Sequence, residues 1–276
     1  MIVLVTGCRS GFGLHTAVLL AREGHVVYAG LRDLSTRAEL DRACAGLAVT
    51  PVQLDVTDPE QRLGVMQQIL GQHGRIDALV NNAGVALGGF WEEVSEAEVR
   101  RVFEVNVFGV WALTQQVLPV MRAQGSGHIV QVSSASGRIA LPGLGVYAGS
   151  KFALEGMSEA LRHEVGPLGI QVTLVEPGPY RTDMTTGPNR TLAAAAARPD
   201  SPYAANHARA EALFDRISRS MGEPQDVAHR IVRILATRHP RLRHPMGLSA
   251  NVRLFATWLL PFALWERLVR ALTAPR

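Results

Sequence analysis

Short apolar runs recur along the chain, and most are followed by a stretch with the periodicity of an amphipathic helix. Such runs are typical of buried strands. They cover residues 1–5, 25–31, 49–54, 76–80, 127–133 and 170–175, and a last strand is expected at 242–248. Because strands alternate with helices and no antiparallel hairpin signal appears, the pattern predicts an α/β fold: a doubly wound parallel sheet with helices on both faces.

Two stretches interrupt this alternation, but neither indicates a second domain, so we expect one domain over residues 1–276. Residues 185–222 contain an alanine run, followed by Pro199 and Pro202, and a polar helix around 208–217. Long insertions at the carboxyl edge of a parallel sheet are usually lids, so a substrate lid is predicted here.

The second interruption is an apolar, helical C-terminal segment at residues 249–276, centred on LFATWLLPFALW at 254–265. The apolar run is too short to span a bilayer, and Pro261 interrupts it. Three interpretations stay open. The segment covers the substrate pocket or packs on the core, it forms a subunit contact, or residues 254–270 rest on a membrane surface as an interfacial helix.

The composition narrows the class of protein. Apolar residues make up 47% of the 276 positions, enough for a sizeable core. Cys8 and Cys44 are the only cysteines, so no disulfide framework and no metal site is expected. A reducing compartment and the lack of a signal-peptide pattern favour a cytoplasmic protein, membrane-associated if the C-terminal segment lies on lipid. The net charge of +4 comes without a basic stripe interleaved with aromatics, which argues against nucleic acid as a partner.

A glycine-rich turn follows the first predicted strand. Residues 6–13 read TGCRSGFG, with the spacing Gly-x-x-x-Gly-x-Gly, and precede a helix expected over 15–22. Glycines let the backbone approach a pyrophosphate, and the helix N-terminus presents N–H groups and the positive end of its dipole. Strand, glycine turn and helix together indicate a dinucleotide-binding, Rossmann-type fold.

The end of the second strand bears on the choice of dinucleotide. Gly30 stands where a protein that prefers NAD commonly carries a carboxylate for the ribose 2′-hydroxyl. Arg32 is close by, and its guanidinium suits a 2′-phosphate; Arg9 could add positive charge. Asp33 is the counter-signal, since a carboxylate repels phosphate. On balance NADP(H) is favoured over NAD(H).

Other polar groups stand at later strand ends. Asp55 could accept a hydrogen bond from an adenine amine, or could simply shape the turn. The turn at 81–84, Asn-Asn-Ala-Gly, can pass close to a ribose, and the rigid turn at 176–182 offers a hydroxyl and backbone groups. Asn106 lies inside a long helix that begins at Ser95 or Glu96; since asparagine is a poor residue for a helix interior, it indicates a kink, a bound water or a functional amide.

The candidate chemistry lies between Ser134 and Lys151. Tyr147 and Lys151 are four residues apart and share one face of a predicted helix. An ammonium beside a phenol favours the phenolate and is expected to lower the pKa of Tyr147. Ser134 ends the fifth strand, and the glycines and proline in between let the chain turn back. The three side chains could meet at one oxygen and transfer a proton to or from a carbonyl or alcohol, but Tyr-x-x-x-Lys alone is a common surface pair.

Taken together, these motifs resemble those of the short-chain dehydrogenases/reductases over roughly residues 2–185. The matching positions are Thr6-Gly7-x-x-x-Gly11-x-Gly13, Asn81-Asn82-Ala83-Gly84, Asn106, Ser134, Tyr147-x-x-x-Lys151 and Pro177-Gly178. The sequence is most similar to the branch with estradiol 17β-hydroxysteroid and retinol dehydrogenases, in which the arginine matching Arg32 serves the NADP phosphate. Phe12 and Gly149 depart from the family, which usually has a small aliphatic residue and an alanine there.

The resemblance implies roles for residues of this chain. Tyr147 would be the general acid or base, Lys151 would lower its pKa and bind the nicotinamide ribose, Ser134 would hold the substrate oxygen, and Asn106 would fix a water. Thr182 would position the carboxamide. Residues expected to contact the cofactor are Gly7, Arg9, Ser10, Gly11, Phe12, Gly13, Arg32, Asp55, Val56, Asn82, Ala83, Gly84, Tyr147, Lys151, Pro177, Gly178 and Thr182. Those expected to contact substrate are Ser134, Ala135, Leu141 and Tyr147.

The expected function is therefore the interconversion of a ketone or aldehyde and an alcohol with NADP(H). A bulky, apolar substrate, such as a steroid, retinoid or polyketide, is expected from the apolar residues at 135–144 and the apolar C-terminus. Two alternatives remain: a nucleotide-binding regulatory protein, and an isomerase or dehydratase that uses the same phenol without net redox. The family resemblance also implies a homodimer or tetramer.

Overall fold

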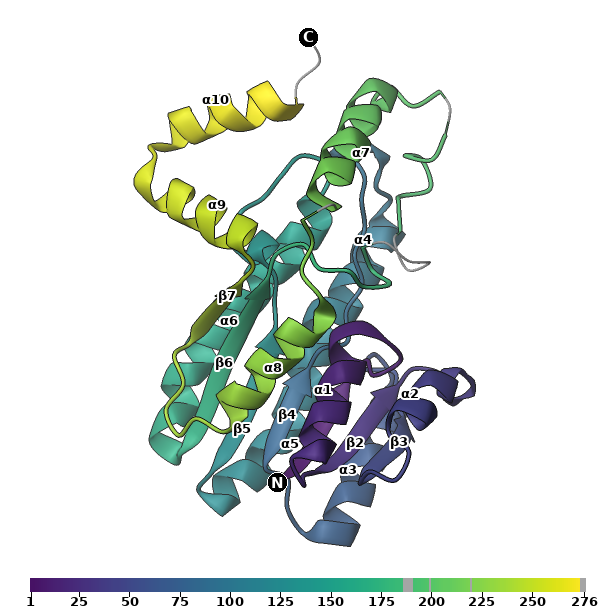
Figure 1. Ribbon diagram of the computed structural model, residues 1–276, viewed down its shortest axis with the longest axis vertical. Helices are drawn as coiled ribbons and strands as arrows, with labels where there is room; N and C mark the ends of the chain where they lie inside the picture. Colours follow the sequence, from purple (N-terminus) through teal and green to yellow (C-terminus); the bar gives the residue numbers. More distant parts are fainter. Residues whose placement is uncertain (186–190, 199, 219, 274–276) are drawn as a thin grey trace.

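Seven parallel strands form the centre of the computed structural model, which describes residues 1–185, 191–198, 200–218 and 220–273 (Figure 1). The strands are β1 (Ile2–Thr6), β2 (Val26–Leu31), β3 (Val49–Gln53), β4 (Ala78–Asn81), β5 (Gly127–Val132), β6 (Ile170–Pro177) and β7 (Arg243–Met246). Their order in the sheet is β3-β2-β1-β4-β5-β6-β7. The order reverses between β1 and β4, and a ligand crevice is expected at the carboxyl ends of these strands.

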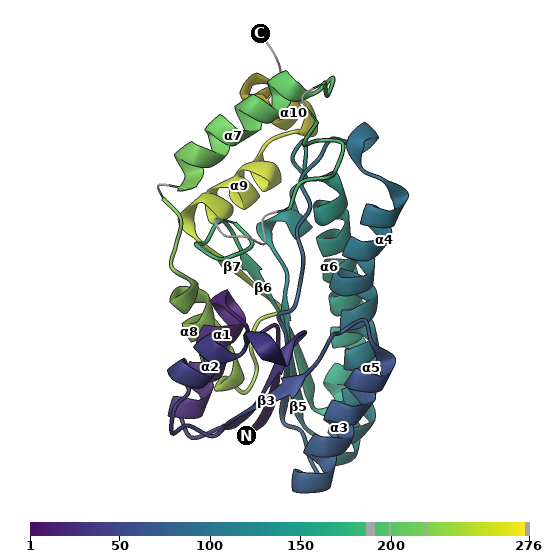
Figure 2. The same cartoon turned by 90° about the vertical axis from the view of Figure 1, so that its right-hand side faces the viewer.

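Helices cover both faces of the sheet (Figure 2). One face carries α1 (Gly11–Arg22), α2 (Ala38–Ala43) and α8 (Pro224–Leu235). The other carries α3 (Pro59–His73), α4 (Glu96–Phe103), α5 (Val110–Gln124) and α6 (Gly145–Val165). The predicted fold class, a doubly wound parallel sheet with helices on both faces, is confirmed.

Side-chain alternation along the strands builds two cores. In β1, Val3 and Val5 pack with residues of α1 and α8, whereas Leu4 packs on the other face with residues of α3 and α5. All three side chains are fully buried. Because both faces of a parallel sheet are covered, its strands are almost continuously apolar, which is why the sequence pattern located them well.

Several boundaries differ from the prediction. Helix α1 begins at Gly11, four residues before the expected start, because the last part of the glycine turn is already helical. The short helix α2 was not predicted. The long helix around Asn106 is divided: α4 and α5 are joined by a π-helical turn at Glu104–Gly109. The expected kink at Asn106 therefore takes the form of this wider turn.

Three further helices lie beyond the carboxyl ends of the strands (Figure 2). They are α7 (Ala204–Ser218), α9 (Leu248–Leu259) and α10 (Phe262–Thr273). Pro261 separates α9 from α10, since proline has no N–H to continue the first helix. Positions 186–190, 199 and 219 of the predicted lid, Pro199 among them, and positions 274–276 of the C-terminal segment lie outside the described residues.

Candidate active site

The glycine turn is built so that no side chain fills it. Gly7 has a φ of +72°, in the region that favours glycine. A Cβ on Gly13 would lie 2.3 Å from the carbonyl oxygen of Gly7. The Asn82 amide donates to the carbonyl oxygens of Thr6 at 2.8 Å and Gly7 at 3.1 Å, and so ties β4 to the turn. The turn leaves open backbone at the N-terminus of α1, which fits a pyrophosphate.

A loop after β6 packs against this turn. The Phe12 ring meets the edge of the buried Tyr180 ring, with centroids 5.7 Å apart. Ser10 Oγ donates to Asp183 Oδ2 at 2.9 Å, and Arg9 lies 3.6 Å from the same oxygen. Phe12, a departure from the family pattern, therefore joins the cofactor turn to the loop that carries Thr182. Arg9, expected to add charge for a phosphate, is instead ion-paired with Asp183.

The residues expected to hold the adenosine end lie at the carboxyl ends of β2 and β3. Arg32 is exposed, directly after β2. Asp33, the counter-signal for NADP, accepts a hydrogen bond from the Ser35 amide at 2.9 Å and caps the next turn. Asp55 accepts from Thr57 N and Oγ1, as a turn residue does, and the neighbouring Val56 is buried.

The first turns of α6 bring Tyr147 and Lys151 to the carboxyl end of β5. Lys151 is buried, and its Nζ donates to the Val132 carbonyl oxygen at 2.8 Å. It lies 6.0 Å from the centre of the Tyr147 ring. Burial lowers the pKa of Lys151 to about 8, and the negative charge of Glu155 opposes this shift.

Ser134 lies opposite Tyr147, directly after β5. Its Oγ accepts from the Ser136 amide at 3.0 Å and lies 3.5 Å from the Pro177 carbonyl oxygen. Burial raises the pKa of Tyr147, and the nearby Ser134 hydroxyl opposes this shift. The expectation that Lys151 lowers this pKa is wrong for the structure, because burial dominates and the ammonium is directed at the Val132 carbonyl.

Asn106 is fully buried in the π-helical turn and holds two neighbouring segments. Its Oδ1 accepts from Val85 N at 2.9 Å, while its Nδ2 donates to the Val85 carbonyl oxygen at 2.8 Å and to Ser150 Oγ at 3.0 Å. A Cβ on Gly84 would lie 3.3 Å from Asn106 Oδ1 and 3.8 Å from Lys151 Nζ. Because the amide already has three protein partners, a water at this residue would have to be held by its main chain.

The expected substrate side lies past the end of β5. Ala135 is buried, and Leu141 is partly buried. On the far side, a Cβ on Gly178 would lie 3.0 Å from the Ala250 side chain, so α9 packs directly on the turn after β6. Ala250 and Leu254 form the buried side of α9. The C-terminal segment therefore packs on the body of the protein along one side of α9.

Sequence reasoning missed several residues around the site. Asp183 and Tyr180 gave no signal, because their partners in the glycine turn are remote in sequence. Glu176 did give a signal in the sequence, because it is a carboxylate at the end of an apolar strand run. In the structure it is fully buried. Glu93, also buried, binds residues before and within α7.

A parallel sheet that reverses at β1/β4, a close-packed glycine turn at a helix N-terminus, and a Ser–Tyr–Lys cluster at the next strand end define a nucleotide-dependent enzyme class. Residues 1–193 match the short chain dehydrogenase family, and the chain belongs to this family. It is an oxidoreductase of a family that uses a nicotinamide cofactor, and the open glycine turn fits such a dinucleotide.

Relatives support the branch expected from the sequence. The chain is 38% identical to an uncharacterized oxidoreductase, YusZ, of Bacillus subtilis, over 98% of this chain and 97% of that protein. It is 36% identical to 3-ketodihydrosphingosine reductase of Bacteroides thetaiotaomicron, over 94% of this chain and 93% of that protein. It is 38% identical to bovine retinol dehydrogenase 8, over 87% of this chain and 80% of that protein. A solved short-chain dehydrogenase from Streptomyces avermitilis has a TM-score of 0.80 at 34% identity and covers 98% of both chains.

Proposed function

We propose that the protein interconverts an apolar, bulky ketone or aldehyde and the corresponding alcohol with NADP(H), and that Tyr147 is the general acid and base. The observation that carries the proposal is that the Ser134 and Tyr147 side chains come together at the end of β5, with the buried Lys151 one turn further along α6. This arrangement offers two hydroxyl groups to one substrate oxygen, which is what carbonyl reduction requires of the protein.

Each residue has a task in this proposal. The bound nicotinamide supplies or accepts the hydride. Ser134 donates a hydrogen bond to the substrate oxygen, and Tyr147 gives the oxygen a proton in reduction or removes one in oxidation. Lys151 stands at the ribose side and restores the proton of Tyr147. The main chain of Asn106 holds a water that passes a proton on to Lys151. Pro177, Gly178 and Thr182 orient the carboxamide.

The preference for NADP(H) rests on Arg32. Its side chain is exposed at the end of β2, and Asp33 is engaged in capping the turn after it. Arg32→Gln is expected to raise the KM for NADPH about tenfold and leave the KM for NADH unchanged, since only the 2′-phosphate is lost as a partner. Arg37→Gln, an exposed arginine paired with Asp41, is the control. Equal loss with both cofactors would contradict the assignment.

Support for a bulky apolar substrate comes from the lining around Ala135 and Leu141 and from the relatives. Two relatives carry the names of long-chain substrates, ketodihydrosphingosine and retinol. We propose a lipid-like substrate, with the insertion at residues 185–222, which includes α7, as its lid. A dimer through the π-helical turn, α5 and α6 is favoured by exposed aromatic residues on these elements: Phe108, Trp111 and Phe152. The two cysteines, Cys8 and Cys44, are free and buried, which fits a reducing compartment such as the cytoplasm.

The first experiment follows NADPH and NADH oxidation over a panel of apolar ketones and aldehydes, with Tyr147→Phe as the matched variant. Turnover with NADPH that falls roughly 10²–10⁴-fold in Tyr147→Phe, at unchanged cofactor affinity, is the expected result. Tight NADPH binding without turnover on any substrate would favour a regulatory nucleotide-binding protein. Conversion of a substrate without cofactor oxidation would favour an isomerase or dehydratase.

A further inference from the structure

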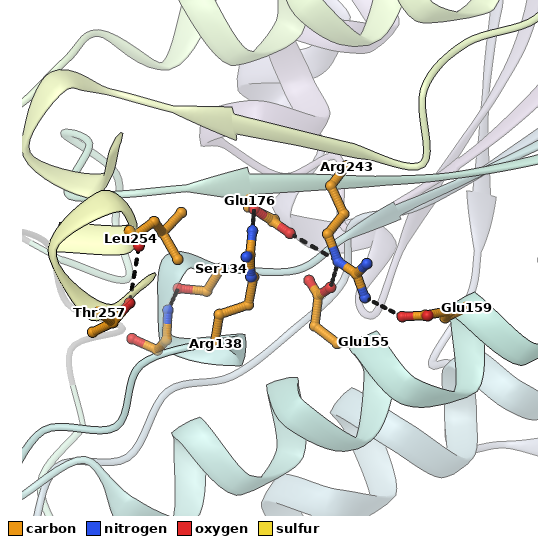
Figure 3. A network of polar contacts seen from close by, with 9 residues as sticks. Ser134, Arg138, Glu155, Glu159, Glu176, Arg243, Leu254 and Thr257 are labelled. Carbon is orange, nitrogen blue, oxygen red and sulfur yellow. Dashed lines mark hydrogen bonds and ion pairs between the residues drawn. The ribbon is translucent and has the colours of Figure 1, made fainter. Parts of the chain in front are cut away.

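Beside the Ser–Tyr–Lys cluster lies a buried group of charged side chains that the proposed reaction does not use (Figure 3). Glu176 at the end of β6 is fully buried, and Glu155 on α6 is 4% exposed. Both carboxylates face the same nitrogen, Arg243 Nε: Glu155 Oε2 lies at 2.9 Å and Glu176 Oε1 at 3.4 Å. Two carboxylates thus converge on one N–H group inside the protein.

The two buried carboxylates have little positive charge of their own. Arg243 also donates to Glu159 Oε2 at 2.6 Å, and Arg138 lies 3.5 Å from Glu176 Oε2. Arg243 is therefore divided among three glutamates, and Arg138 is half exposed. The next charged group on α6, Lys151, donates to the Val132 carbonyl instead. His244, the next residue of β7, points to the opposite face of the sheet and contacts the Arg241 carbonyl.

The hydrogen bonding of the two carboxyls also indicates that one of them is protonated. Glu155 Oε1 and Glu176 Oε1 are both buried without a hydrogen-bond partner among the described residues. A buried carboxylate oxygen without a donor is costly, and a proton on one carboxyl would remove one of the two buried negative charges. Burial and the charge of Glu155 also raise the pKa of Glu176 to about 7.

This pair borders three segments that carry the proposed chemistry: the Ser134 turn, α6 and the end of β6. Glu155 lies one turn beyond Lys151 on α6. Its Cγ would be 3.0 Å from a Cβ on Gly137, in the turn that follows Ser134. Glu176 precedes Pro177, whose carbonyl oxygen lies 3.5 Å from Ser134 Oγ. A change of charge at the pair is therefore transmitted within two residues to Ser134 and within one helical turn to Lys151.

We propose that Glu155 and Glu176 share one proton at neutral pH, and that this pair positions the Ser134 turn against α6 only while the proton is present. Loss of the proton leaves two carboxylates competing for Arg243 Nε at a site closed to water. The repulsion separates the end of β6 from α6 and moves Ser134 away from Tyr147. Both glutamates are positioning residues, and the effect on turnover rests on the proposed function.

The activity test compares pH profiles of kcat/KM between pH 5.5 and 9 for the wild type, Glu176→Gln and the control Glu159→Gln. The wild type and the control are expected to show a fall of roughly fivefold as pH rises through the titration of the pair. Glu176→Gln, which keeps the uncharged shape, is expected to retain the activity seen on the acid side and to lose this step. A purely structural role would lower activity at every pH. An unchanged step in Glu176→Gln overturns the proposal.

A second measurement needs no substrate. The infrared carbonyl band of a protonated carboxylic acid is expected in the wild-type protein at pH 6, when other glutamates are ionised, and it should disappear as pH rises through about 7–8. The band should be absent in Glu176→Gln and present in Glu159→Gln. If the band is missing from the wild type, the shared proton does not exist. If the band titrates but no substrate turns over, the protonated glutamate pair is confirmed and the proposed function is contradicted.

Discussion

Gly13 demonstrates how a single Cβ can decide whether a cofactor fits. A methyl group there would lie 2.3 Å from the Gly7 carbonyl oxygen and 2.6 Å from Asn82 Nδ2. These two atoms are hydrogen-bonded to each other, and moving them apart would break the contact between the glycine turn after β1 and the turn after β4. The glycine is required by this close approach and not by its φ, which lies outside the left-handed region.

Gly13→Ala is therefore expected to destabilise the protein by about 2–3 kcal/mol and to abolish detectable cofactor binding. Gly64→Ala is the control, because Gly64 lies in α3 with open space around its Cβ position. Gly64→Ala should stabilise the protein by about 0.5–1 kcal/mol, because alanine lowers the conformational entropy of the unfolded chain. Thermal melting and NADPH fluorescence titration measure both effects. Normal binding by Gly13→Ala would show that the turn opens more widely than this structure.

Glu176 gives a prediction for stability that is separate from activity. Its pKa is raised from 4.5 to about 7, so the native protein keeps a proton that the unfolded chain has already released between these values. The unfolded state then binds fewer protons, and stability falls as pH rises through this window. Glutamine has no proton to lose. Glu176→Gln is expected to be about 1–2 kcal/mol more stable than the wild type at pH 8, roughly 3–6 °C in Tm, with a smaller gain at pH 5. A gain that does not grow with pH would contradict the raised pKa.

Elements with a continuous apolar pattern were predictable, and those held by distant contacts were not. The strands were found within about three residues at each end because burial on both faces leaves a clear sequence signal. Ser95 was correctly identified as a candidate helix start, and its side chain caps α4. The π-helical turn around Asn106 was only indicated as a kink, since its geometry depends on Val85 and Ser150 in other segments.

The candidate site was predictable in its residues but not in its electrostatics. Motif spacing brought Ser134, Tyr147 and Lys151 to one strand end. It could not show that Lys151 Nζ would be directed at the Val132 carbonyl, nor that burial would raise the pKa of Tyr147. Those facts depend on the packing of α6 against β5, which no local pattern records.

The segment before α7 contacts the body of the protein at several places, and one of them is an aromatic cluster that a single substitution can remove. Phe90 stacks on Tyr203 with centroids 4.8 Å apart and meets the His207 ring edge-on at 5.1 Å. His207 also contacts Glu93 at 2.8 Å. Aromatic pairs of this kind contribute about 0.5–1.5 kcal/mol beyond their buried area.

Phe90→Ala is expected to release this anchor, raising the substrate KM roughly five- to tenfold with a smaller change in kcat, if the insertion at residues 185–222 is the substrate lid. Hydrogen exchange in α7 should accelerate in the same variant. Arg198→Ala removes an exposed ion pair with Asp200 in the same segment and should change neither quantity. Faster exchange with an unchanged KM would mean that the segment does not cover the substrate.

At the scale of the whole molecule, the α9–α10 pair gives the protein an asymmetric surface. No helix among the described residues is long and apolar enough to cross a membrane. Yet Leu248, Val252, Phe255 and Leu259 form one stripe along α9 and are all at least 58% exposed, opposite its buried Ala250 and Leu254. Trp258 and Phe262 extend the stripe to the start of α10. A contiguous apolar surface of this kind marks a contact with a partner or a lipid surface.

The surface lies beyond the carboxyl ends of the strands, the end of the sheet at which the candidate site also lies (Figure 1). Arg267 and Arg270 stand on α10, and Glu266 is already paired with Arg270 at 2.7 Å, so the local charge favours an anionic surface. A lipid-like substrate would be delivered to the site from such a surface. We therefore expect α9 and α10 to lie in the interface of a bilayer that contains anionic lipid.

Co-sedimentation with vesicles of phosphatidylcholine and phosphatidylglycerol tests this expectation. The wild type should bind, and binding should weaken with added salt because the arginines contribute. A variant with Trp258→Gln and Phe262→Gln should lose most of its binding, roughly tenfold or more in the partition coefficient, because two aromatic side chains leave the interface. Trp91→Gln removes a similarly exposed aromatic residue that is remote in sequence, the first residue of η2 (Trp91–Glu93), and should bind like the wild type. Equal binding by all three proteins would exclude α9–α10 as the lipid contact. If the double variant instead changed from dimer to monomer in sedimentation equilibrium, the stripe would be a subunit interface, and the exposed aromatics of α5 and α6 would need another explanation.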